Sequence, residues 1–302
     1  MSTGAAAQQP AALSIKRILY PLLAHSKAKQ TLKWIVYSAL VVNTGFYFQD
    51  DYQSMVGALP DNATLLDYVF QFATTLDMIA WLGLVFLFEL ETYAIEDHDW
   101  NDWVGRLIHG ARVVCYIMIV NSAVGYTVEA LETFDRHEIN GVTSMCDMAD
   151  QGDYAQISAN EYPEITSENC AEISAGSPYY TLANEEAVVA ADVVPHLQFM
   201  GILDIVNAYV WIIVVLLIEL EVFLQSNDRF SSKTLTVARQ AKSLLYLILI
   251  GNCVIWLLND YYLYAWDSFL WIFGFWAIEL NLAEWEKDRL EELHSDPNSS
   301  PA

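Results

Sequence analysis

The chain has 302 residues, of which 55% are hydrophobic, and its 38 acidic and 14 basic residues give a formal net charge of −24. This acidic balance disfavours a nucleic-acid partner, because phosphate binding depends on basic side chains. The composition also argues against an ordinary soluble domain, since six stretches approach the length of about 20 mostly apolar residues that a membrane span needs. These stretches lie near 34–48, 68–90, 107–128, 197–224, 243–258 and 268–283.

The predicted fold is an all-α polytopic membrane protein, whose six transmembrane helices form three parallel two-helix repeats. In chain order, the expected parts are a cytoplasmic segment with a short amphipathic helix (1–30), hairpin 1 (31–95), hairpin 2 (106–224), hairpin 3 (240–286) and a cytoplasmic tail (287–302). Hairpin 2 contains an acidic extracytoplasmic insertion at 131–195 between its two helices.

The distribution of Lys and Arg predicts the orientation. Thirteen of the fourteen basic residues fall on one side of the six spans, and only Arg136 falls on the other. Cytoplasmic loops carry an excess of Lys and Arg, so both termini are expected in the cytoplasm. The acidic composition favours a cell membrane, specifically the inner membrane of a bacterium.

The insertion holds thirteen acidic residues and one Arg, which is half of the net charge. It also contains Cys146 and Cys170, which an oxidising exterior would allow to form a disulfide. Such a cross-link typically stabilises a fold by about 3 kcal/mol. Asp147, Asp150 and Asp153 do not have the spacing of an EF-hand loop, so a solvated acidic turn is the favoured interpretation.

Two patterns are each written three times, which indicates a triplicated unit. In the first, an Asp or Asn precedes a Trp by four residues and a Glu follows that Trp by eight: Asp77–Trp81–Glu89, Asn207–Trp211–Glu219 and Asp267–Trp271–Glu279. The second joins a basic residue, a Tyr and an Asn: Lys33–Tyr37–Asn43, Arg112–Tyr116–Asn121 and Lys242–Tyr246–Asn252. Two spans per unit make the copies parallel, unlike the inverted repeats of many transporters.

The repeated glutamates have two interpretations. In one, Glu89, Glu219 and Glu279 form a ring that binds cations or relays protons on the cytoplasmic side. In the other, each Glu forms a structural lock with the basic residue and the Tyr of its own hairpin, because residues four apart share a helix face. The lock candidates are Lys33, Tyr37, Arg112, Tyr116, Lys242 and Tyr246.

The remaining repeated polar residues also allow two interpretations. Asn43, Asn121 and Asn252 either hydrogen-bond between helices or line an ion path in mid-membrane. Trp commonly marks the membrane interface, so the Trp ends of the helices are expected at the outer rim. Asp77 and Asp267 would there form an acidic ring that attracts cations, or would cap and hydrate the helices.

These residues predict an integral membrane cation or proton channel or transporter, because intramembrane carboxylates commonly mark ion pathways. The alternative is a non-transporting scaffold or sensor, in which the polar clusters are structural locks and the insertion binds a protein partner or a second copy. No catalytic residue, metal site or cofactor is predicted, since the zinc, phosphate and redox motifs are missing from the sequence. The expected partners are the lipid bilayer and cations or protons.

Overall fold

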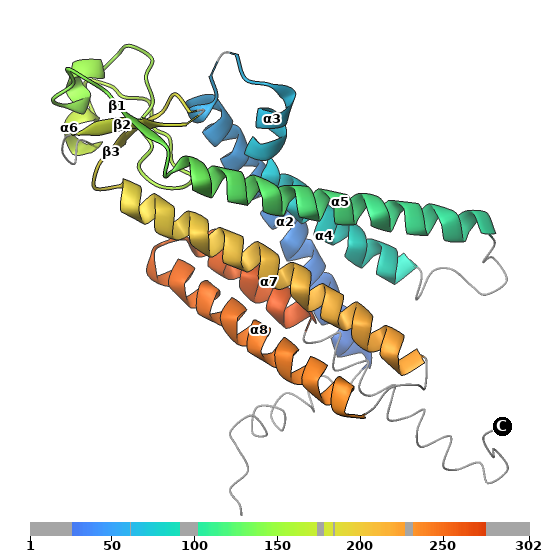
Figure 1. Cartoon of the computed structure of the whole chain (residues 1–302). Helices are drawn as coiled ribbons and strands as arrows, with labels where there is room; N and C mark the ends of the chain where they lie inside the picture. The colour runs from blue at the N-terminus through green and yellow to red at the C-terminus, as the bar shows by residue number, and fades with distance from the viewer. Residues whose placement is uncertain are drawn as a thin grey trace, which may run out of the picture. The chain divides into compact units, whose positions relative to one another are not determined.

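The structure is a computed structural model that describes residues 26–60, 62–90, 102–173, 178–183, 185–226 and 232–275 (Figure 1). The chain divides into two units, one formed by 1–41 with 273–302 and the other by 42–272. Most of the described chain is helical. The mostly helical character of the predicted fold is thereby shown, although a small sheet is also present.

Long helices make up most of the second unit, and α2 begins in the first unit. The helices are α2 (Ser26–Ala58), α3 (Leu65–Gln71), α4 (Ala73–Glu89), α5 (Asp102–Glu132), α6 (Cys170–Ile173), α7 (Val194–Ser226) and α8 (Ser232–Leu258), with a short 3-10 helix η2 (Met145–Met148). Residues 262–275 are also helical. Helix α4 contacts α5, α5 contacts α7 and α7 contacts α8.

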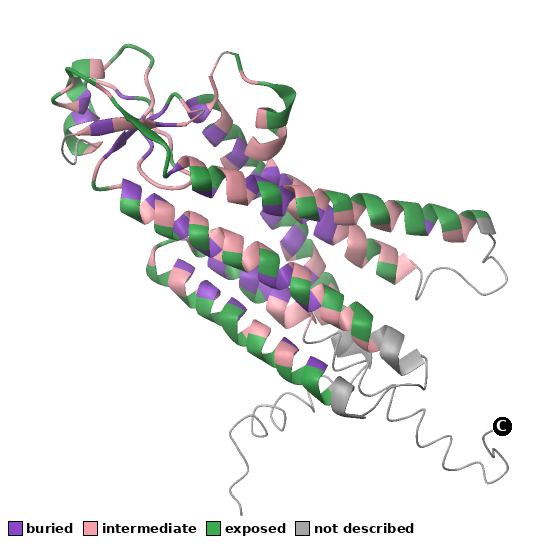
Figure 2. Cartoon of the chain, in the orientation of Figure 1, coloured by how far each residue is buried: buried purple, intermediate pink, exposed green. Residues whose placement is uncertain are grey.

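Three described helices are long and apolar enough to cross a membrane: Trp103–Glu132, Val194–Glu221 and Thr236–Leu258. Helices α3 and α4 make a fourth candidate if they are one span, with a bend of 67° between them. Large apolar side chains are exposed along α8 (Figure 2), as on a surface that faces lipid. The structure thus supports membrane association, and the six-span layout stays a prediction.

Helix α4 begins at a tertiary cap. Its N-cap residue, Phe72, has no side chain that can bind the free N–H groups of the first turn. Asp51 of α2 takes this role, because its Oδ2 atom accepts hydrogen bonds from the backbone N of Thr75 at 2.9 Å and from the Thr75 hydroxyl at 2.6 Å. The negative carboxylate also suits the positive end of the helix dipole.

Helices α5 and α7 approach closely at Gly201. A Cβ atom added there would lie 2.8 Å from the Cβ atom of Ala130. The glycine therefore allows a helix contact that a larger residue would separate, as small residues do in membrane helix pairs.

The first unit is described only in part. Trp34 and Tyr37 form an edge-on aromatic pair with ring centroids 6.4 Å apart. Val36 is buried, and its Cγ1 atom lies 3.7 Å from the position that a Cβ atom would take on Gly274. Helical residues near the two ends of the chain thus pack together in this unit.

The predicted insertion is a small folded region between α5 and α7 (Figure 1). Its strands β1 (Arg136–Glu138), β2 (Tyr179–Leu182) and β3 (Val188–Ala190) form an antiparallel sheet in the order β1-β2-β3. Tyr179, Val188 and Ala190 pack with Met145 and Ile165 in its hydrophobic core. The sequence predicts a polar insertion but not this sheet.

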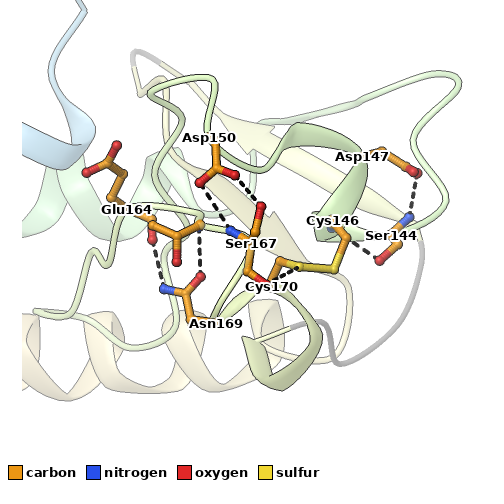
Figure 3. Close-up of a disulfide and its surroundings, with 9 residues drawn as sticks. Ser144, Cys146, Asp147, Asp150, Glu164, Ser167, Asn169 and Cys170 are labelled. Carbon is orange, nitrogen blue, oxygen red and sulfur yellow. Dashed lines mark hydrogen bonds between the residues drawn. A yellow bond between two sulfur atoms is a disulfide. The ribbon is translucent and has the colours of Figure 1, made fainter.

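The disulfide Cys146–Cys170 joins the two short helices of the insertion, η2 and α6 (Figure 3). Cys170 belongs to the buried core and the two cysteines are 24 residues apart. The predicted cysteine pair is therefore present, and it closes a loop that has little regular structure of its own.

Candidate functional site: buried acidic groups in the helices

The three repeated tryptophans meet in the interior of the second unit. The ring centroid of Trp81 lies 6.3 Å from that of Trp211 and 6.2 Å from that of Trp271. Each of the three is at most 8% exposed. The sequence places them at an outer membrane interface, whereas the structure makes them core residues, because three large apolar rings bury more surface against one another than against headgroups.

Each repeated carboxylate accepts a hydrogen bond from the indole N–H of the Trp four residues later. Asp77 is bound in this way by Trp81, and Asp267 by Trp271. Residues four apart lie on one face of a helix, so the spacing of the repeat is explained by a local bond. Asp267 also accepts a hydrogen bond of 2.9 Å from Nδ2 of Asn43, and this bond joins two of the sequence repeats.

Two amides occupy the equivalent positions in other repeats: Asn207 corresponds to Asp267, and Asn252 corresponds to Asn43. Asn252 is 4% exposed, and its Nδ2 atom has no hydrogen-bond partner. Oδ1 of Asn207 is likewise shielded from solvent and without a partner. Asn121, in contrast, is half-buried. The repeated polar residues thus form one bonded carboxylate–amide pair and leave polar atoms with unused hydrogen-bonding capacity.

Three further acids belong to the same region. Asp51 caps α4, Glu129 lies near the end of α5, and Asp204 lies near the start of α7. The charge of Asp51 acts on Glu129, and that of Glu129 acts on Asp204. The charge of Asp267 acts on Asp77 in the same manner. Asp51 and Asp267 are buried, Asp77 and Asp204 are half-buried, and Glu129 is exposed. We call Asp51, Asp77, Asp204 and Asp267 the buried acids.

Tyrosine side chains lie among the buried acids. Tyr47 and Tyr264 form an edge-on pair with ring centroids 5.3 Å apart. Both have an electrostatic interaction with Asp204. Tyr126 has a side-chain hydrogen bond with Thr74 and an electrostatic interaction with Asp77. Phenolic hydroxyls both donate and accept hydrogen bonds, so they suit a path along which protons or hydrated cations pass between carboxylates.

Glu185 extends this region into the insertion. The residue is half-buried, but its Oε2 atom is shielded from solvent and has no hydrogen-bond partner. Loss of hydration raises the pKa of Glu185 to about 8, and the charges of Glu129 and Glu132 contribute in the same direction. The insertion therefore adds, near Glu129 and Glu132, a carboxyl group whose ionisation is disfavoured.

No basic residue is available in the sequence to neutralise these acids locally. The stretches 34–105, 113–228 and 243–286 contain one Lys or Arg in total, Arg136. Arg136 lies in β1 with its guanidinium over the ring of Tyr180, 4.9 Å from the centroid. A buried carboxylate without an opposite charge costs much free energy, so these groups must be protonated or bind cations or water.

The acids near the end of α7 show the opposite arrangement. The hydroxyl of Tyr116 donates a hydrogen bond of 2.9 Å to Glu219, which lies in the same predicted hairpin. Lys242 binds Glu221 at 2.8 Å, and Arg239 binds the same carboxylate at 2.9 Å. The Tyr–Glu part of the proposed lock thus forms in hairpin 2, whereas Lys242 of hairpin 3 pairs with the second glutamate of hairpin 2.

The other predicted site residues are placed as follows. Glu219 has an exposed side chain, Glu89 is half-buried, and Glu279 lies outside the described residues. Lys33 and Tyr37 belong to the first unit and the remaining described candidates to the second. Arg112 is half-buried and Tyr246 packs edge-on against Trp211, with centroids 6.4 Å apart. The ring of three glutamates therefore stays a prediction.

The acids of the insertion bind their own backbone (Figure 3). Asp147 accepts hydrogen bonds from the backbone N–H groups of Thr143 and Ser144, both at 2.9 Å, and caps η2. Asp150, which has a positive φ of 60°, accepts from the backbone N–H and the hydroxyl of Ser167. These bonds lower the pKa of both carboxyls. Among the described residues, no three His, Cys, Asp or Glu side chains form a metal site.

Sequence reasoning missed Asp51, Glu129 and Asp204, although a signal for two of them was present. Asp51, Glu129 and Asp260 each follow the repeated Asn of their unit by eight residues. The third member, Asp260, lies beyond the end of α8, is exposed, and accepts a hydrogen bond from Tyr262. The repeat therefore carries an acid at this position too, and its burial differs between the copies.

Comparisons with known proteins give no further indication. No family model, no curated protein and no solved structure matches the chain.

Proposed function

We propose that the protein is an integral membrane channel or transporter for protons or small cations, with the buried acids in its conduction path. The observation that carries this proposal is the burial of two carboxyl groups, Asp51 and Asp267, in helical stretches that hold no basic residue. Ionisable groups inside membrane segments are costly and commonly line ion pathways. Asn43 and Asp267 would act together, since they already share a hydrogen bond.

The proposed layout is the six-span arrangement of three parallel hairpins in a cell membrane, with both termini in the cytoplasm. Its support is the segregation of basic residues in the sequence. In this layout the insertion and Glu185 lie on the outer side, and the Tyr116–Glu219 and Lys242–Glu221 contacts lie on the inner side.

Flux measurements test the proposal. The purified full-length chain is reconstituted into liposomes, and proton flux is followed with an enclosed pH dye while valinomycin and potassium balance the charge. Sodium and potassium fluxes are measured in parallel. Wild type should exceed empty vesicles for at least one of these ions, and Asp267→Asn should reduce that flux at least about tenfold, the usual scale for loss of one essential interaction.

Asparagine is a well-matched replacement at 267, because the chain itself has Asn207 at the corresponding position of another repeat. Its carbonyl oxygen can still accept the bonds from Asn43 and Trp271. Asp260→Asn is the control, since Asp260 is an exposed acid of the outer turn. Equal flux in the wild type and Asp267→Asn would remove Asp267 from the path.

The second candidate is a non-transporting scaffold or sensor. It is favoured by the structural roles that several acids have: Asp51 caps α4, and Glu221 holds Lys242. In this case the insertion would bind the partner. Wild-type vesicles that pass no ion above the background of empty vesicles would support this candidate over transport.

A further inference from the structure

An open pocket of about 460 Å³ lies between the end of α2 and a loop of the insertion, wholly within the second unit. Its lining is mostly apolar and includes three tyrosines, Tyr52, Tyr154 and Tyr162, with one acidic residue, Glu161. The volume falls in the range of small-molecule sites. None of the functions proposed above uses this pocket.

The wall of the pocket is held in place by bonds that do not depend on a ligand. The hydroxyl of Tyr162 accepts a hydrogen bond of 2.7 Å from Nε2 of Gln156. The loop is closed by a backbone bond of 3.1 Å from the N of Ile157 to the O of Glu161. Tyr162 also packs on Gly57 of α2, where an added Cβ atom would lie 2.5 Å from the Cβ of Tyr162. The loop and the Tyr162 part of the wall are thus preorganised.

The electrostatic surroundings of the pocket are negative. Glu161 has an exposed side chain, and it lies close enough to Asp50 for its charge to act on that carboxyl. The insertion that supplies the loop holds thirteen acidic residues and one basic residue, Arg136, whose guanidinium lies over the ring of Tyr180. An anionic ligand would therefore meet repulsion here, and a cation would meet attraction.

We propose that this pocket binds a small organic ammonium ion, with the tyrosine rings against its alkyl groups and the Glu161 carboxylate near its charge. Aromatic rings with a carboxylate are the usual surroundings of a quaternary ammonium group, because the faces of the rings carry negative charge. An inorganic cation would gain little from a mostly apolar lining, since it needs several oxygen ligands. The ammonium group could come from a free ion or from a choline lipid headgroup.

Titration calorimetry on the purified full-length chain in detergent tests the proposal. Tetramethylammonium chloride is the probe, and equal concentrations of potassium chloride give the background. Saturable binding of tetramethylammonium, at least about tenfold tighter than any binding of potassium, is expected. Glu161→Gln and Tyr52→Leu should each weaken this binding several-fold, because both residues line the pocket. Tyr52 is 51% exposed, so its replacement leaves the core intact.

Glu168→Gln and Tyr68→Leu are the matched controls, since both side chains are exposed and neither lines the pocket. They should bind the probe as the wild type does. A wild type that binds tetramethylammonium no better than potassium would overturn the proposal, and so would pocket variants that bind as tightly as the controls. The measurement needs no ion flux, so its outcome is independent of the proposed transport function.

Nanodiscs separate the two sources of the ligand. If the pocket holds a lipid headgroup, tetramethylammonium should bind more weakly in phosphatidylcholine nanodiscs than in phosphatidylglycerol nanodiscs. If it holds a free ion, the two affinities should agree. Both results support an ammonium site and assign its occupant.

Discussion

The two ends of the helices use acidic residues in opposite ways. At one end, Glu219 and Glu221 are bound by Tyr116, Lys242 and Arg239 from neighbouring helices. Toward the other end, Asp77 and Asp267 have indole and amide donors, but the surrounding sequence offers them no positive charge.

The difference shows that a carboxylate in an apolar helix has no single role. A carboxylate that is bound by Lys or Arg fixes two helices together, and its charge is balanced by the basic partner. A carboxylate without a basic partner has to exchange that charge with protons or cations, because its ionised form is poorly solvated. The neighbours in space, rather than the residue type, therefore separate a structural lock from a candidate ion site.

The largest expected difference between the two regions is in stability. Glu221→Gln should lower the free energy of unfolding by roughly 3 kcal/mol, because it leaves the Lys242 ammonium, only 11% exposed in its side chain, without a full countercharge. Asp77→Asn should cost far less, because no base depends on Asp77. Denaturation of both variants in the same detergent measures the difference. Equal losses would contradict the contrast between the two ends.

A pH-dependent effect should follow from Glu185. Its pKa is raised from 4.5 to about 8 in the folded chain. Folding therefore favours the protonated form, and stability falls as the pH rises from about 4.5 toward 8, then levels off. The full shift corresponds to about 5 kcal/mol at most, and partial exposure of the residue reduces the expected effect to roughly 2 kcal/mol.

Glu185→Gln removes this titration and tests the expectation. Melting in detergent should show the variant more stable than the wild type at pH 9, with the advantage lost at pH 5. Glu186→Gln is the matched control, because Glu186 is the adjacent exposed residue. An advantage that is the same at both pH values would show that the ionisation of Glu185 is not its cause.

The smallest expected effect sharpens the role of the Tyr–Glu contact. Tyr116→Phe removes only the hydroxyl that donates to Glu219. The loss of one hydrogen bond should lower the free energy of unfolding by about 1 kcal/mol, and ion flux should not change. A strong loss of flux without loss of stability would instead place Glu219 in the conduction path and revive the predicted glutamate ring.

The repeat could be recognised in the sequence, and some of the contacts that its residues make could be predicted from their spacing. The spacing of Trp and acid indicates a shared helix face, and Asp77–Trp81 and Asp267–Trp271 are bonded in this way. The cysteine pair in the insertion was predictable from the acidic exterior segment that the sequence suggests, and the mostly helical class from the length of the apolar stretches. These features depend on local spacing and composition.

The sequence by itself determined which helices carry acids and that long apolar stretches without Lys or Arg separate the clusters of basic residues. Only the tertiary structure decided that the three tryptophans pack together in the core, that Asp51 caps α4, and that Lys242 chooses Glu221. The physical reason is that the partner of a buried polar group comes from another helix, and the rotation and offset of that helix are set by packing over its whole length.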